Sequence, residues 1–362
     1  MKICIVTPTL MPHDAIGNDL RHQCGILNNK IQTKVFAENF LADEFTNEYM
    51  ISRSKLFKLI DNINNILIYH HAVSWDLGQE ILEDANCKIY IKYHNISYPD
   101  FFYPYSALYA EVCKNGREQT KKIVSLNKVN KYLCDSNFNA QDILELGVNK
   151  ENIEIVAPFH KLDDFNNTKV DTSLTVELLK GQINILFVGR FSPNKGHKHL
   201  IHAIDFFSKM YDRNICLNIV GGLDTSLNAY INEMKALILQ FGLEDIIKIH
   251  DQISFEQLHT YYQFSHIFLL MSEHEGFCVP ILEAQIHNLP IIALNTTAIL
   301  ETIGENQIIF DELDYSEIAS AIYVIAKNYK YRYYLGQNGQ NNLRHYSNKK
   351  IENTLLKALR VG

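Results

Sequence analysis

The chain of 362 residues has a single tryptophan, only eight prolines and no excess of positive charge. Its 34 Lys and Arg residues stand against 41 Asp and Glu, which gives a formal net charge of −7. Nucleic-acid binding draws most of its affinity from a basic surface, so this charge argues against a nucleic-acid partner. No run of 18 consecutive apolar residues occurs, and we therefore expect no membrane-spanning helix.

The sequence also shows neither a CxxC pair nor the pattern of a signal peptide near Met1. Seven cysteines are an odd number, and none of them form a CxxC pair, which predicts a reduced, cytoplasmic protein without a zinc site. The apolar run near Met1 has no small-residue cleavage site and is interpreted as a first buried strand rather than a signal peptide. Residues 327–362 contain eight Lys or Arg and the single acid Glu352, which leaves open a contact with the inner face of the cytoplasmic membrane.

Short apolar runs alternate with amphipathic segments along the whole chain. This pattern is typical of buried parallel strands joined by helices. The expected strands of the first half are residues 3–6, 33–37, 66–69, 88–93, 131–134 and 153–156. Those of the second half are residues 183–188, 215–220, 246–250, 267–271, 290–293 and 307–310.

Two such series predict an α/β fold with two Rossmann-like domains that face each other across a cleft. The polar segment 161–180 is taken as the linker, so we expect an N-terminal domain over residues 1–165 and a C-terminal domain over residues 166–345. The amphipathic helix within residues 346–362 is expected to pack back on the first domain. Ligands of open α/β sheets bind at the carboxyl ends of the strands.

The segment GRFSPNKG at residues 189–196 follows a strand of the second series. Gly189 lets the backbone approach a ligand, and Arg190 and Lys195 supply two positive charges beside a helix start, which suits a diphosphate. Alone, the segment could equally be a turn with two surface charges. Gly222 ends the next strand, and the loop that contains Ile253 and precedes a helix beginning at Phe255 could line a nucleobase pocket or serve only as a capped turn.

The most specific feature is EGFCVPILEA at residues 275–284. A strand leads into a loop that contains Glu275, and a helix begins at Val279 with a proline in its first turn. Glu283 then lies on that helix, and two carboxylates so placed can accept paired hydrogen bonds from the two sugars of one ligand. The backbone amides of the three residues that follow Glu275 are expected to face the same ligand, namely Gly276, Phe277 and Cys278.

These motifs resemble those of the family 4 retaining glycosyltransferases of GT-B fold, and the resemblance covers nearly the whole chain. In similar enzymes the residue matching Glu283 holds the donor ribose, and the one matching Glu275 bonds the donor hexose. Arg190 and Lys195 correspond to residues that bind the diphosphate. No DxD sequence occurs, and no cofactor or metal is implied.

The first half is similar to the family members that build bacterial surface polysaccharides. The resemblance implies that the domain over residues 1–165 binds the acceptor and that the domain over residues 166–345 binds the nucleotide sugar. A histidine matching His94, directly after a central strand, lies at the donor sugar and reaction centre in the wider family. Residues 14–19 occupy the place of a glycine-rich loop, but Gly17 is followed by Asn18, where many relatives have a second glycine. Weaker candidates for acceptor contacts in this half are Asp14, Gly17, Asn18, His71 and Asn95.

The resemblance implies a retaining, metal-independent hexosyltransferase with His94, Glu275, Arg190 and Lys195 at its catalytic centre. It would move a hexose from a nucleotide diphosphate sugar, GDP-mannose or a UDP-sugar, to a glycan or lipid-linked saccharide. Two alternatives stay open. A nucleotide-sugar 2-epimerase uses the same pair of domains and consumes the donor without an acceptor. A non-catalytic sugar-nucleotide-binding protein would bind the donor without turnover.

Overall fold

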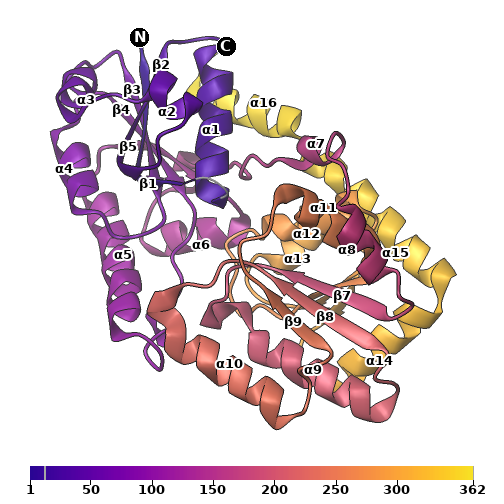
Figure 1. Ribbon diagram of the computed structural model, residues 1–362. Helices are drawn as coiled ribbons and strands as arrows, with labels where there is room; N and C mark the ends of the chain where they lie inside the picture. Colours follow the sequence, from indigo (N-terminus) through magenta and orange to yellow (C-terminus); the bar gives the residue numbers. More distant parts are fainter. Residues whose placement is uncertain (12–13, 362) are drawn as a thin grey trace. The chain divides into compact units, whose positions relative to one another are not determined.

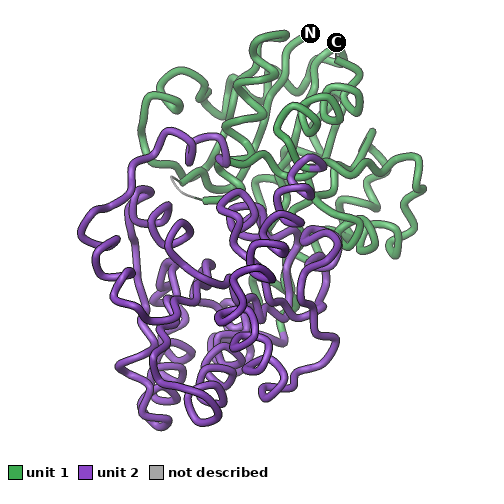
Figure 2. The backbone as a smooth tube through the Cα atoms, turned by 90° about the vertical axis from the view of Figure 1, so that its right-hand side faces the viewer, with its two compact units in different colours: residues 1–99, 110–160, 346–362 green, residues 100–109, 161–345 purple. Residues whose placement is uncertain are grey.

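The computed structural model describes residues 1–11 and 14–361, in two compact units (Figure 2). Unit 1 comprises residues 1–99, 110–160 and 346–362, and unit 2 comprises residues 100–109 and 161–345. Each unit is a parallel sheet with helices along its faces (Figure 1).

The sheet of unit 1 has the strand order β2-β1-β3-β4-β5-β6. Its strands are β1 Ile3–Leu10, β2 Thr33–Phe40, β3 Ile66–His71, β4 Lys88–Tyr93, β5 Val129–Cys134 and β6 Ile153–Ile155. Every residue of β3 is buried, as expected for a central strand that is covered on both faces. The helices are α1 Ala15–Asn28, α2 Glu44–Tyr49, α3 Arg53–Ile60, α4 Asp76–Asp84, α5 Ala107–Ser125, α6 Asn137–Glu145 and α16 Asn348–Leu359.

The last helix, α16, belongs to unit 1 although it follows all of unit 2 in sequence. Its apolar residues Ile351, Leu355 and Leu359 lie in one buried cluster with Leu20 of α1 and Ile5 of β1. Figure 1 shows α16 in yellow beside α1. The four-residue spacing of these side chains places them on one helical face, which explains why α16 packs as it does.

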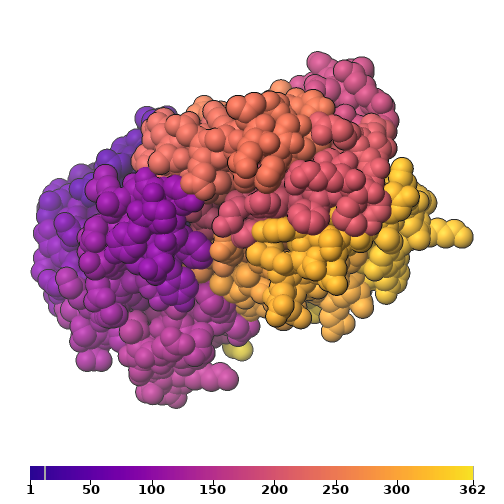
Figure 3. Space-filling view, turned by 90° about the horizontal axis from the view of Figure 1, so that it is seen from below, coloured from indigo at the N-terminus to yellow at the C-terminus, as the bar shows by residue number. Residues whose placement is uncertain are grey.

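The sheet of unit 2 has the strand order β12-β11-β10-β7-β8-β9. Its strands are β7 Ile183–Val188, β8 Ile215–Val220, β9 Ile247–His250, β10 Ile267–Leu270, β11 Ile291–Leu294 and β12 Ile308–Phe310. The helices are α7 Leu162–Phe165, α8 Thr172–Leu178, α9 His197–Met210, α10 Asn228–Gln240, α11 Phe255–Phe264, α12 Val279–Ile286, α13 Ile299–Ile303, α14 Tyr315–Lys327 and α15 Tyr329–Asn342. Figure 3 shows part of the outer surface of this unit, with α9 in rose between α10 in salmon and α14 in amber.

The sequence suggests a single boundary near residue 165. In the structure, residues 100–109 also group with unit 2, so unit 2 includes a short segment of the first half. Aromatic side chains hold this segment. The hydroxyl of Tyr105 bonds Glu233 at 3.3 Å, and its ring meets that of Tyr230 edge-on. Phe101 lies against the imidazole of His274.

No helix of the described residues is long and apolar enough to cross a membrane.

Candidate functional site

In unit 2 two loops at the carboxyl edge of the sheet are tied together by backbone hydrogen bonds. The carbonyl of Asn194 accepts from the amides of Glu273 at 3.0 Å and His274 at 3.2 Å. Gly196 adopts a left-handed conformation, with φ of 66°, and a side chain there would meet the carbonyl oxygen of Met271 at 1.9 Å. Only glycine fits this close approach, so the loop after β7 is held against the loop after β10.

This contact brings Lys195 beside Glu275. The ammonium of Lys195 donates to Glu275 Oε2 at 2.8 Å, and the two side chains are only 17% and 8% exposed. The loop is fixed further because the amide of Glu275 donates to Thr297 Oγ1 at 2.8 Å. A cation and a carboxylate are therefore placed together at the edge where ligands of parallel sheets bind.

The helix α12 begins directly after this loop. Cys278 is its N-cap residue with φ of 74°, and Pro280 lies in the first turn, where the missing amide hydrogen costs nothing. Gly276 and Phe277 lead into that helix start. Burial raises the pKa of the Cys278 thiol well above its ordinary value, so Cys278 contributes its backbone conformation rather than a thiolate.

Glu283 lies on α12, one turn beyond its start, and is held by Tyr262 of α11. The buried Tyr262 hydroxyl donates to Glu283 Oε2 at 2.7 Å, which orients the carboxylate. Burial raises the pKa of Glu283, and the bond from Tyr262 only partly offsets this effect. The carboxyl group is thus set in one orientation by a neighbour that pattern alone did not indicate.

Gly221 lets the residue after β8 lie close to the residue after the neighbouring strand β7. A side chain at Gly221 would lie 2.0 Å from the carbonyl oxygen of Gly189. The carbonyl of the next residue, Gly222, accepts a hydrogen bond from the amide of Phe191. A side chain at Gly222 would extend into open space, so packing does not require glycine at this position.

Arg190 follows Gly189 and is exposed. Its guanidinium donates to the hydroxyl of Tyr109, in the segment 100–109, at 3.3 Å. Ile253 is half-buried and directly precedes Ser254, which caps α11 by accepting from the amide of Gln257. The capped turn that the sequence offered before Phe255 is therefore present in the structure, with Ser254 as the cap.

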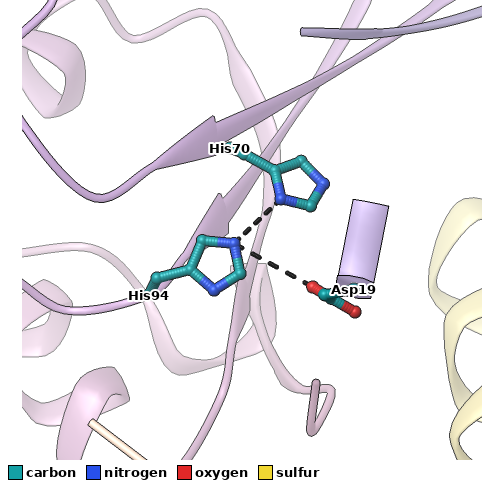
Figure 4. A group of neighbouring side chains, drawn as sticks. All are labelled: Asp19, His70 and His94. Carbon is teal, nitrogen blue, oxygen red and sulfur yellow. Dashed lines mark hydrogen bonds and ion pairs between the residues drawn. The ribbon is translucent and has the colours of Figure 1, made fainter. Parts of the chain in front are cut away.

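In unit 1 His94 follows β4, and its side chain is 5% exposed. Its Nδ1 lies 2.9 Å from Asp135 Oδ2, and its Nε2 lies 2.9 Å from Nδ1 of His70. Lys92 donates from the other side to Asp135. Figure 4 shows Asp19 of α1 facing the same two imidazoles. Its Oδ2 lies 3.9 Å from His94 Nε2.

The weaker candidates in unit 1 have local structural partners. Asp14 is the N-cap of α1, and its side chain accepts from the amide of Gly17 at 3.2 Å, so Gly17 and Asn18 lie in the first helical turn instead of a loop. His71 is almost fully buried, and its Nε2 bonds Thr120 Oγ1 of α5 at 2.9 Å. Successive residues of a strand face opposite sides of the sheet, so His70, and not His71, reaches His94.

Asn95 adopts a left-handed conformation, with φ of 68°. Its amide donates to Asp142 Oδ2 of α6 at 3.3 Å, and the same carboxylate accepts from the hydroxyl of Tyr93. These contacts account for the loop that carries the chain away from β4.

Asp19, His70 and His94 offer nitrogen and oxygen atoms within 4.8 Å of one another. A divalent ion is disfavoured there for two reasons. The two imidazoles already make a nitrogen-to-nitrogen hydrogen bond, which occupies the lone pair of one of the two facing nitrogens. The ammonium of Lys92 lies 3.9 Å from Asp19 and already supplies positive charge. We therefore describe the group as a hydrogen-bonded cluster.

Sequence comparison connects the second half with enzymes of sugar transfer. Residues 174–342 match the family model of the glycosyl transferases group 1. The capsular polysaccharide biosynthesis glycosyltransferase CapM of Staphylococcus aureus is 30% identical over 182 residues, which are 49% of this chain and 43% of that protein. The D-inositol 3-phosphate glycosyltransferase of Corynebacterium efficiens is 26% identical over 166 residues, 45% of this chain and 39% of that protein. The chain thus spans less than half the length of these curated relatives.

Solved structures resemble the chain over its full length. HepE of Anabaena, solved in complex with UDP and glucose, gives a TM-score of 0.79 at 15% identity and covers 99% of each chain. WaaG, a glycosyltransferase involved in lipopolysaccharide biosynthesis, gives 0.73 at 12% identity and also covers 99% of each chain. These likenesses confirm the predicted fold class, the two Rossmann-like domains of the GT-B type.

Proposed function

We propose that the chain is a retaining, metal-independent glycosyltransferase that moves a hexose from a nucleotide diphosphate sugar to a glycan or lipid-linked saccharide in polysaccharide synthesis. The ion pair of Lys195 and Glu275 carries the proposal. It sets a cation for the diphosphate next to a carboxylate for the sugar, at the ligand-binding edge of a unit whose residues 174–342 match a glycosyltransferase family.

The proposed chemistry follows from where charge develops. As the bond between the sugar and the diphosphate breaks, negative charge builds on phosphate oxygens, and Lys195 and Arg190 stabilise it in place of a metal ion. Glu275 accepts hydrogen bonds from the hexose, and Glu283 accepts them from the ribose. Glu275 is engaged by Lys195, which suits a positioning role better than nucleophilic attack.

In this proposal the acceptor hydroxyl attacks from the face that the diphosphate leaves, and the leaving phosphate takes its proton. His94 of unit 1 is assigned to the donor sugar on the strength of the family resemblance. Asp14, Gly17 and Asn18 are kept as weaker acceptor candidates. The chain would work in the cytoplasm, at the inner face of the membrane where the acceptor is lipid-linked.

The first experiment is a thermal-shift screen of the full chain against UDP-, GDP- and dTDP-sugars, because a ligand that binds only the folded state raises the melting temperature. The resemblance favoured GDP-mannose, while the solved HepE complex holds UDP and glucose, so both bases are included. The donor that binds is then assayed for transfer to glycans and lipid-linked saccharides, with and without EDTA, and the product anomer is read by NMR.

We expect transfer with retained anomeric configuration that EDTA does not reduce. The Glu275→Ala variant should lose roughly ten- to a hundredfold in rate, the value of one charge-assisted hydrogen bond. A folded Glu275→Ala protein with unchanged turnover would contradict the central assignment. Release of an epimerised sugar without any acceptor would favour the 2-epimerase instead.

A further inference from the structure

A chain of buried polar side chains in unit 1 ends at His94. Lys92, on β4, is fully buried and donates to Asp135 Oδ1 and to the carbonyl of Val156. The other carboxylate oxygen, Asp135 Oδ2, lies 2.9 Å from His94 Nδ1. One carboxylate therefore joins a cation on one side to an imidazole on the other.

The charge of this carboxylate is fixed by its neighbours. Burial alone would raise the pKa of Asp135, but the nearby His94 and Lys92 and their hydrogen bonds hold it below the ordinary value. Asp135 and Asp19 in turn hold the pKa of Lys92 above its usual range against the effect of burial. A carboxylate can only accept hydrogen bonds, so the nitrogen of His94 that faces Asp135 must carry a proton.

The groups around His94 come from four elements. Asp135 follows β5, His70 lies on β3, Asp19 lies on α1, and Lys92 precedes His94 on β4. Burial lowers the pKa of His70 well below its usual value, so His70 is neutral. Its Nδ1 meets His94 Nε2 at 2.9 Å, and its Nε2 has no hydrogen-bond partner among the described residues.

These contacts determine the proton positions when His94 is neutral. The proton of His94 lies on Nδ1 and is donated to Asp135, so Nε2 carries the lone pair. His70 then donates its own Nδ1 proton to that lone pair, which agrees with a His70 Nε2 that needs no acceptor. Every bond in the chain runs in one direction, from His70 through His94 to Asp135 (Figure 4 shows the part from His70 to His94).

We propose that Asp135, itself oriented by Lys92, is a positioning residue that holds the His94 proton on Nδ1 and leaves Nε2 as the hydrogen-bond acceptor of this site. The proposal deepens the assignment of His94 to the reaction centre and rests on it for its consequences in catalysis. In transfer, a sugar hydroxyl would take the place of the His70 N–H group as the donor to that nitrogen. Loss of the Asp135 carboxylate would turn His94 Nε2 from an acceptor into a donor.

The Asp135→Asn variant tests this reasoning sharply. Lys92 has only hydrogens to offer, so the amide oxygen of the new side chain must face Lys92. Its NH2 group then faces His94 Nδ1, which must become an acceptor, and the proton moves to Nε2. The matched control is Asp142→Asn, because Asp142 contacts Tyr93, Asn95 and Arg117 and has no bond to His94.

The measurement is nitrogen-15 NMR of the full chain with labelled histidine, recorded from pH 5 to 9. The signals of His94 are assigned from the spectrum of a His94→Gln variant. We expect the Nδ1–H form in the wild type and in Asp142→Asn at the alkaline end, and the Nε2–H form in Asp135→Asn. If the His94 proton of the wild type lies on Nε2, the proposal is overturned even if Asp135→Asn does not fold. The proposal is also overturned if the proton stays on Nδ1 in a folded Asp135→Asn variant.

The spectrum needs no turnover, so its result is independent of the proposed activity. Where a donor and acceptor pair is found, Asp135→Asn should reduce kcat by roughly tenfold or more, the value of one hydrogen bond to a charged or polarised group, with little change in the donor KM. A flipped proton with unchanged kcat would overturn the part of Asp135 in catalysis. A flipped proton in a protein that transfers no sugar would count against the proposed function alone.

Discussion

Replacing Lys195 with methionine keeps much of the apolar length of the side chain and removes the ammonium that donates to Glu275 Oε2 at 2.8 Å. The two side chains are only 17% and 8% exposed, so water screens charges little at this position. A bond from Lys195 to a diphosphate here should therefore have the full value of a charge-assisted hydrogen bond. Each such bond is worth roughly 1.5–3 kcal/mol, or about ten- to a hundredfold in affinity. We therefore expect Lys195→Met to weaken the binding of a nucleoside diphosphate by that factor.

The Glu275→Gln variant should behave differently. It removes the carboxylate that is proposed to hold the hexose and leaves Lys195 available to the diphosphate. Its affinity for the nucleoside diphosphate should stay within about threefold of the wild type, a difference under 1 kcal/mol. Its affinity for the nucleotide sugar should fall about ten- to a hundredfold. Isothermal titration with the diphosphate and with the corresponding sugar nucleotide measures both.

The control is Lys198→Met, since Lys198 is an exposed lysine in the first turn of α9 and has no assigned part in donor binding. It separates a specific loss from a general change in surface charge. Equal diphosphate affinity in Lys195→Met and the wild type would refute the reasoning. So would an equal loss in Lys195→Met and Lys198→Met, because the effect would then be long-range electrostatics.

Three further predictions concern stability, measured by urea unfolding. Tyr262→Phe removes the buried donor to Glu283 Oε2 and should cost about 1–3 kcal/mol, and unchanged stability would mean that the hydroxyl does not orient Glu283. Gly196→Ala forces a side chain to within 1.9 Å of the Met271 carbonyl at a φ of 66°, so it should destabilise by more than about 1 kcal/mol, and a neutral effect would show that the loops can separate freely. Burial lowers the pKa of His197 to about 3. Between pH 6.5 and 3 the unfolded chain therefore binds a proton at His197 that the folded chain does not, and the free energy of unfolding decreases as the pH is lowered through this window. His197→Leu should remove about 1 kcal/mol per pH unit of this slope, and an unchanged slope would contradict a neutral buried His197.

Much of the fold follows from the sequence because both sheets are parallel and buried. Strands covered on both faces need continuous apolar runs, such as residues 66–69 and 267–271, and these stand out against the amphipathic helices. The return of α16 was indicated by its apolar stripe. The grouping of residues 100–109 with unit 2 was not, because Phe101 and Tyr105 form contacts with partners more than 120 residues away.

The two candidate sites differ in how much the sequence could predict. In unit 2 the residues of interest follow strand ends in short motifs, so Lys195 and Glu275 could be placed at one sheet edge before their 2.8 Å contact was seen. In unit 1 the partners of His94 are spread over four elements. Lys92 is a charged residue within a largely apolar strand. The neighbouring residues in the sequence do not indicate that its side chain faces Asp135 rather than solvent.

The Lys195 and Glu275 pair depends on the backbone as much as on the two side chains. The Asn194 carbonyl holds two amides of the opposite loop, and the Asn194 side chain donates to the His274 carbonyl at 3.1 Å, so three bonds join the loops within two residues of the pair. The proposed donor site of unit 2 is therefore preorganised before a ligand arrives, and binding need not order these loops. It follows that changes at Asn194, whose side chain bonds Ser192 and the His274 carbonyl, should impair donor affinity through the position of Lys195.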